Sequence, residues 1–123
     1  MQLFIKTMLL TMMIKFSFAG IVSHDDLKYD DGIYYIKGST EKYTGEVLSK
    51  DESGKIFNES NYIDGKPNGI STLWSKNGNK YSEVNYQKGI RDGLTTFWYE
   101  NGDKKLSLNF IGNLVYGFTV YLN

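Results

Sequence analysis

The sequence predicts an all-β protein, built as an elongated antiparallel meander of consecutive β-hairpins with a 24-residue repeat. Three observations lead to this prediction. Glycines recur every 24 residues, Asn-Gly pairs recur at the same interval, and each pair lies between runs of aromatic and β-branched residues. A fixed period of this size is typical of chains that stack one supersecondary unit repeatedly. Arrays of this kind usually present extended binding surfaces.

The period is visible as columns of like residues at 24-residue intervals. These columns are Gly45, Gly69, Gly93 and Gly117; Gly54, Gly78 and Gly102; Tyr62, Tyr86 and Phe110; Asn61, Asn85 and Asn109; and Trp74, Trp98 and Leu122. Glycine supplies positive φ and aromatic rings pack on pleated sheets, so both residue types suit short strands joined by tight turns.

The Asn-Gly pairs place the first turn of each unit. Asn77-Gly78 and Asn101-Gly102 predict type I′ hairpins, because this dipeptide tolerates positive φ at both central positions. Gly69 and Gly93 open the units, and links at 64–68 and 88–92 reverse the chain between them. The expected strands are 45–50, 55–63, 69–76, 79–87, 93–99 and 103–111, with a closing strand at 117–122.

The first 19 residues have the three-part layout of a secretory signal peptide. Lys6 gives a positive start, an apolar stretch follows at 7–14, and Ser17-Phe18-Ala19 supplies small residues for cleavage after Ala19. Lys15 shortens the apolar stretch, so a leader on a cytoplasmic protein is the alternative. We expect an exported protein, periplasmic or secreted, with domains at 1–19 (signal peptide), 20–42 (polar lead-in) and 43–123 (about three repeats and the closing strand).

The lead-in holds the chain's single histidine among acidic residues. His24, Asp25 and Asp26 fit no compact ligand set, and the chain has no Cys or second His to complete a metal shell. We therefore expect a solvated acidic lead-in, no metal and no cofactor. The Asn-Gly turns, with Asp92 and Asp103 nearby, lack the calcium-loop pattern and are explained by turn chemistry alone.

Charge and composition argue against two function classes. The chain has 14 basic and 14 acidic residues, and removal of the leader leaves 12 against 14, which disfavours nucleic-acid binding through phosphates. Catalysis lacks the usual nucleophile–base sets. Glu59 and Glu83 share one column, and such a pair could act as in a glycosidase, but exposed Glu on a strand is ordinary. We expect no enzyme.

Aromatic side chains are the candidates for partner binding. Trp and Tyr dominate binding hot spots, although the same columns also offer the only obvious core of a repeat sheet. Strand alternation places the Tyr62 column on one face and the Asn61 column on the other. The candidates are Trp74, Trp98, Tyr81, Tyr99, Tyr62 and Tyr86.

These units resemble the MORN-repeat variant family. The resemblance covers roughly 31–123 and rests on the Asn-Gly hairpin, a following aromatic, a link such as Tyr86-Gln87-Lys88-Gly89, and a Gly that opens the next unit. It implies a run of β-hairpins in an elongated sheet. Many such proteins are identified as YwqK-like antitoxins of toxin–antitoxin systems. The chain departs from the pattern at Ser53 and at Gly112-Asn113.

Taken together, the residues and the resemblance predict a non-catalytic repeat protein that binds another protein, a toxin or an envelope component. An antitoxin or immunity role is one version of this function. The alternative is an exported cell-envelope module that contacts lipid or glycan. No basic stripe or amphipathic helix supports lipid contact.

Overall fold

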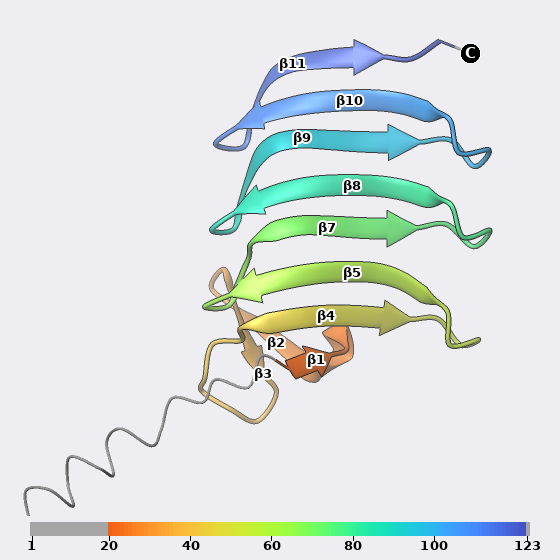
Figure 1. The fold of residues 1–123 in the computed structure, drawn as a ribbon. Coiled ribbons are helices and arrows are strands. Elements are labelled where there is room, and N and C mark those ends of the chain that lie inside the picture. The colour runs from red at the N-terminus through yellow and green to blue at the C-terminus, as the bar shows by residue number, and fades with distance from the viewer. Residues whose placement is uncertain (1–19, 123) are drawn as a thin grey trace, which may run out of the picture.

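The computed structural model describes residues 20–122. Nine strands form one long sheet in the order β1-β4-β5-β7-β8-β9-β10-β11, with β6 paired to β5, and β2 and β3 form a separate hairpin (Figure 1). The expected leader at 1–19 lies outside the described residues. The bounds are β1 Gly20–Val22, a 3-10 helix η1 His24–Asp26, β2 Leu27–Asp30, β3 Ile33–Ile36, β4 Gly45–Lys50, β5 Ile56–Ile63, β6 Lys66–Pro67, β7 Gly69–Trp74, β8 Lys80–Gln87, β9 Ile90–Trp98, β10 Lys104–Ile111 and β11 Leu114–Val120.

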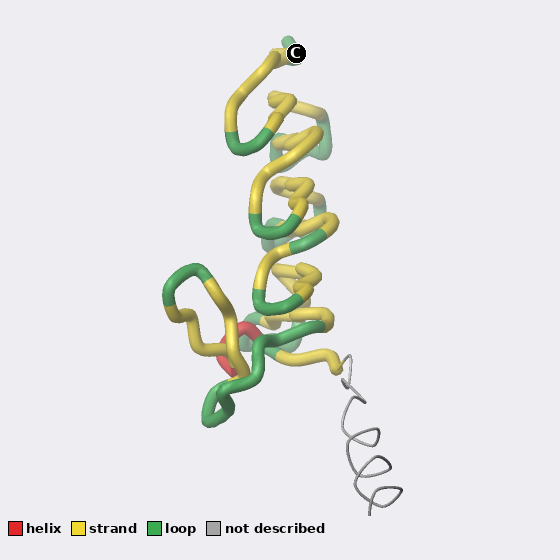
Figure 2. Tube along the Cα trace, turned by 90° about the vertical axis from the view of Figure 1, so that its left-hand side faces the viewer, coloured by secondary structure: helices red, strands yellow, loops and turns green. Residues whose placement is uncertain are grey.

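The predicted meander is confirmed. From β4 to β11 every neighbouring pair of strands is antiparallel, and each repeat supplies two strands: β4–β5, β7–β8 and β9–β10. Seen from the side, the curved hairpins stack into a narrow column, and the lead-in lies beside its lower end (Figure 2). β9 and β11 begin earlier than expected, at Ile90 and Leu114.

The predicted turn type at the Asn-Gly pairs is wrong. Gly78 has a φ of 88° and Asn77 is not among the positive-φ residues, so the pair cannot form a type I′ turn. Instead Gly78 N donates to Ser75 O at 2.9 Å and Ser75 N donates to Asn79 O at 2.9 Å. This is a type I turn followed by a left-handed glycine that forms a bulge. Asn101-Gly102 repeats the same pattern.

Type I′ geometry occurs at the opposite ends of the strands, in the links between units. Asp64-Gly65 and Lys88-Gly89 have positive φ at both positions, with values of 49° and 76° in the first and 49° and 83° in the second. Each lies between directly paired strand residues, as two-residue type I′ loops require. Gly112-Asn113 forms the third such turn, so the reversed order of these two residues keeps the loop type.

Glycines that open the units bend the first strand of each repeat. Gly93 has a φ of 92° inside β9, where Val84 pairs with Thr95 but Tyr86 pairs with Arg91. β9 therefore has two more residues than β8 over this stretch, and a bulge of this kind bends a strand. Gly69 has the same φ of 92° at the start of β7. The repeated bend curves the whole sheet.

The last strand is out of phase with the repeat by one residue. Thr95 pairs with Val84, and 24 residues later the equivalent Thr119 should pair with Leu108. In the structure Leu108 pairs with Phe118 instead. Gly117 is correspondingly absent from the positive-φ glycines, so β11 lacks the sharper bend. Because side chains alternate between faces, the slip moves Phe118 to the face that Leu108 occupies.

The lead-in folds as a cap on the first repeat, while its acidic side chains are exposed to solvent, as expected. β1 pairs in parallel with β4 and covers part of the sheet's edge. Leu27 is buried in a core with Tyr43, Val47 and Tyr62, and Tyr34 packs its ring at 5.1 Å from that of Tyr62. Terminal caps of this kind are what repeat arrays need, because the first unit has no preceding neighbour.

Candidate functional site

The Tyr62 column forms the interior of the bend. Tyr62 and Phe110 are buried, whereas Tyr86 between them is half-buried. The guanidinium of Arg91 lies 4.4 Å from the centre of the Phe110 ring. Burial, then the neighbouring hydroxyls of Tyr34 and Tyr86, raise the pKa of Tyr62 to about 12. Of the two tyrosines in this column that were predicted to bind a partner, Tyr62 is therefore core, and only Tyr86 retains an exposed surface.

The two tryptophans lie on the other face, here called the asparagine face because it carries Asn61, Asn85 and Asn109. Both rings are half-buried. Equivalent positions in successive units are two strands apart, about 9–10 Å, which is too far for one ring to stack on the other. Trp98 joins a cluster with residues from other columns, whereas Trp74 lines none of the hollows described below.

Three of the predicted aromatics meet at the end of the sheet where the Asn-Gly turns lie. Tyr81, Trp98, Tyr99 and Lys105 line two adjoining hollows of about 210 and 190 Å³, which we call the aromatic cleft. Register shifts between β7 and β8 and between β9 and β10 fall beside Tyr81 and Lys105, so these bulges aim both side chains at the cleft. Its remaining lining residues are Phe97, Leu106, Ser75, Lys80 and Glu100.

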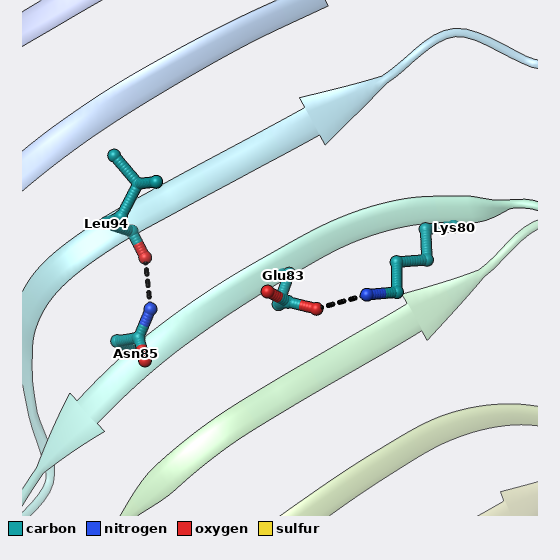
Figure 3. Close-up of polar contacts among 4 residues, drawn as sticks. All are labelled: Lys80, Glu83, Asn85 and Leu94. Atoms are coloured by element: carbon teal, nitrogen blue, oxygen red, sulfur yellow. Dashed lines mark hydrogen bonds and ion pairs between the residues drawn. The ribbon is translucent and has the colours of Figure 1, made fainter. Parts of the chain in front are cut away.

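Ammonium groups flank the rings of the cleft. Lys80 Nζ lies 5.5 Å from the Trp98 ring centre, and Lys105 Nζ lies 5.4 Å from that of Tyr99. Lys80 also forms an ion pair of 2.6 Å with Glu83 (Figure 3). Cation–π contacts at exposed sites contribute about 0.5–1 kcal/mol each and hold the lysine stems against the rings. The cleft thus combines apolar ring faces with positive charge.

A second hollow lies inside the bend, on the face that carries Tyr62 and Tyr86. We call it the tyrosine groove; its volume is about 280 Å³, and Tyr34, Tyr62, Tyr86, Pro67 and His24 supply its rings. Hydroxyl and amide groups line its floor, contributed by Asn58, Ser60, Ser71 and Ser82. Sequence reasoning missed His24 and Tyr34 because neither belongs to a repeat column. Their ring centres lie 5.7 Å apart in an edge-on contact.

A comparison with protein families locates three consecutive repeats. The MORN repeat variant model matches residues 43–64, 67–88 and 91–111, which together make up more than half of the chain. The chain belongs to the MORN repeat variant family. The matched segments begin 24 residues apart, in agreement with the period of the glycines and aromatics. No curated protein matches the chain.

Several asparagine side chains of this MORN repeat variant hold neighbouring strands or turns together by donating hydrogen bonds to backbone carbonyls. Asn85 Nδ2 donates to Leu94 O at 2.6 Å across the neighbouring strands (Figure 3). Asn77 and Asn79 each donate through Nδ2 to Glu100 O at 2.8 Å. The predicted turn residue Asn77 therefore holds the next unit's turn, which carries one rim of the aromatic cleft.

The described part of the chain shows neither a metal centre nor a long apolar helix. Within residues 20–122, no group of three or more His, Cys, Asp or Glu side chains is placed to hold a metal ion. Over the same residues, no helix has the length and apolar character needed to cross a membrane.

Proposed function

We propose that this MORN repeat variant is a non-catalytic repeat protein that binds another protein through the aromatic cleft. The observation that carries the proposal is the cluster of Tyr81, Trp98 and Tyr99 beside the ammonium of Lys105. Tyr and Trp supply large contact area at low entropic cost and are enriched in hot spots. An apolar side chain with a neighbouring carboxylate on the partner would match both the rings and the lysine.

The twin hollows favour a partner that inserts two neighbouring side chains. Each hollow, at about 210 and 190 Å³, is below the 300–1,000 Å³ usual for small-molecule sites. Tyr81 and Trp98 line both, so they separate the two inserted groups. A protein surface loop or strand offers side chains at this spacing, because alternate residues of a strand lie on the same side.

The binding claim is tested by Tyr81→Ala against a matched control. Tyr81 is 55% exposed, and Tyr29, in the lead-in hairpin, is 62% exposed, so both truncations remove a similar exposed ring. We expect Tyr81→Ala to weaken capture of the natural partner at least about tenfold, and Tyr29→Ala to change it little. Equal affinity for both variants would refute the cleft as the docking site.

An antitoxin or immunity role is the specific version that we propose, with the partner being a toxin encoded in the neighbouring reading frame. Co-expression of the two should restore growth and yield a complex that purifies together. Tyr81→Ala should abolish the rescue while its soluble yield equals that of Tyr29→Ala. Toxicity that persists in the presence of the folded wild-type chain would refute this version.

We also propose that the chain is exported, with residues 1–19 removed as a signal peptide. The three-part layout of these residues supports this. Mass spectrometry of cell fractions should find a chain that begins at Gly20 outside the cytoplasm. Only the intact form in the cytoplasm would refute export.

The tyrosine groove favours one second candidate function, contact with an envelope glycan. Tyr34 and Tyr86 supply ring faces, and Ser60 and Ser71 supply hydroxyls that already lie 2.7 Å from each other. Rings and hydroxyls together suit a neutral sugar. Glycan-array binding that Tyr86→Ser removes would support this candidate, and no retention of any glycan would refute it.

A further inference from the structure

β11 forms the second edge of the described sheet and is paired on one side only. Its partner is β10, over residues 106–111. At the opposite end, β1 covers three residues of β4 with a parallel ladder. Among the described strands, none pairs with the outer side of β11.

The hydrogen-bond pattern fixes which groups of β11 point outward. Tyr121 N donates to Lys105 O at 3.1 Å, next to the directly opposite pair Leu106–Val120. Because this bond belongs to the opposite pair Lys105–Tyr121, the next pair, Leu106–Val120, is not hydrogen-bonded. Hydrogen-bonded and non-hydrogen-bonded pairs alternate along an antiparallel ladder. The backbone N–H and C=O groups of Thr119 and Gly117 therefore point to β10. The N–H and C=O of Phe118 and Val120 point to the outside.

The composition of β11 does not protect this edge. Natural edge strands usually carry Lys, Pro or an inward-pointing charge that blocks further pairing. Residues 114–122 contain no charged residue and no Pro. Tyr116 is 78% exposed and Phe118 is 72% exposed. Strand and side chains are therefore both available to a partner without repulsion.

The one-residue slip of β11 extends an apolar surface to the edge. Phe118 lies beside Leu108, and Val120 lies beside Leu106. In the register of the other repeats, Thr119 would be beside Leu108 instead. The slip therefore replaces a hydroxyl side chain with an apolar one on this face, next to the outward hydrogen-bonding groups.

We propose that the outer edge of β11 pairs antiparallel with β11 of a second copy of this chain, with the two-fold axis at Thr119. Phe118 would form a hydrogen-bonded pair with Val120 of the second copy, and Val120 would form the same pair with Phe118 of the second copy. Thr119 would lie opposite itself in a pair without hydrogen bonds. Phe118 and Val120 are equally distant from the axis, so the outward N–H and C=O groups of each would find partners on the second strand.

This register repeats a contact that the sheet already uses. Gly69 lies directly opposite Tyr86, and Gly93 lies directly opposite Phe110. With the axis at Thr119, Gly117 would lie opposite Tyr121 of the second copy. An aromatic ring across from a glycine compensates for the missing side chain in a strand.

Charge and size also favour a second copy over another occupant. The uncharged strand offers a charged peptide no opposite charge, whereas two such strands approach without cost. Large aromatic side chains carry about 150–250 Å² each, so the pairing would bury on the order of 1,000 Å² in total. An interface at this low end of the stable range predicts a reversible, concentration-dependent dimer.

A single cysteine tests the axis, because the native chain has none. Directly opposite residues in a pair without hydrogen bonds have Cα atoms about 4.5 Å apart, within disulfide range. We expect the full-length Thr119→Cys variant to form a covalent dimer under mild oxidation at least about fivefold faster than Phe118→Cys. Glu52→Cys, in the exposed turn after β4, controls for random collision. Equal rates for all three variants would overturn the proposal.

A proline variant tests the edge without disturbing the fold. Val120→Pro removes an outward N–H that makes no bond to β10, so circular dichroism and melting of the monomer should be unchanged. Light scattering of the wild-type chain should show the mass doubling with concentration, and Val120→Pro should remain at the single-chain mass. A wild-type chain that stays monomeric throughout, or a dimer that Val120→Pro leaves intact, would overturn the proposal.

Discussion

Replacement of Tyr62 by Phe should remove a component of stability that the chain loses in alkali. The pKa of Tyr62 is about 12 in the folded chain and its ordinary value is 10, because burial disfavours the phenolate. The neutral hydroxyl is therefore favoured by folding. This contribution is fully present below pH 10 and is lost as the pH rises from 10 to about 12.

The size of the effect follows from the two pKa values. Each pKa unit corresponds to about 1.4 kcal/mol, so the complete loss is about 2.7 kcal/mol. Near pH 11, about half of it, roughly 1.4 kcal/mol, is lost. Tyr62→Phe keeps the ring within the core of Leu27, Tyr43 and Val47, so its stability near neutral pH should change by less than about 1 kcal/mol.

Urea unfolding, followed by the fluorescence of Trp74 and Trp98, measures the free energy of unfolding at each pH. Between about pH 8 and pH 11, the wild-type chain should lose roughly 1.4 kcal/mol more than Tyr62→Phe. Other groups that titrate in this range are common to both proteins, so the difference isolates Tyr62. The reasoning is refuted if both proteins lose the same stability over this interval.

Two further changes test the bend and the cap. Gly93→Ala should lower the free energy of unfolding by about 1–2 kcal/mol, because its φ of 92° is strained for a side chain, whereas the added Cβ would meet Asn85 Cβ at an ordinary 3.7 Å and cause no clash. Gly117→Ala, in the same column without positive φ, should be nearly neutral in the same urea assay, and equal losses would contradict this account. Leu27→Ala should cost about 2–3 kcal/mol and raise amide exchange first in β4 and β5, whereas uniform exchange along the sheet would show that the lead-in is no local cap.

The columns predicted the fold because each one repeats a local requirement. A left-handed glycine, a ring inside the bend and a turn asparagine are needed in every unit, so they recur in the sequence. The turn types could not be assigned from Asn-Gly alone, because a type I turn with a glycine bulge and a type I′ turn both place Gly at positive φ. The two turn types differ in the φ of Asn77, which the dipeptide alone does not determine.

The candidate site was predictable only in part, because residues that are neighbours on adjacent strands come from different repeat columns. Trp74 and Trp98 match in sequence but are separated by a strand, whereas Tyr81 and Trp98 come from neighbouring strands and meet. The lead-in has no repeat signal at all. Leu27 and Tyr34 are placed by contacts with Tyr62 that form only when the chain has folded.

The bonds between successive turns give the array a modular length. Asn77 binds the carbonyl of Glu100 one unit further on, and Lys88 N binds Asn68 Oδ1 at 3.0 Å at the opposite ends of the strands. The preceding turns are joined in the same two places by different groups, Lys55 Nζ to Lys76 O and Asp64 N to Thr44 Oγ1. Duplication or loss of one unit would keep hydrogen bonds of this kind between successive turns. It would change the distance between the two ends of the sheet by two strand spacings, about 9–10 Å. The length of the sheet can therefore change only in fixed steps of one unit.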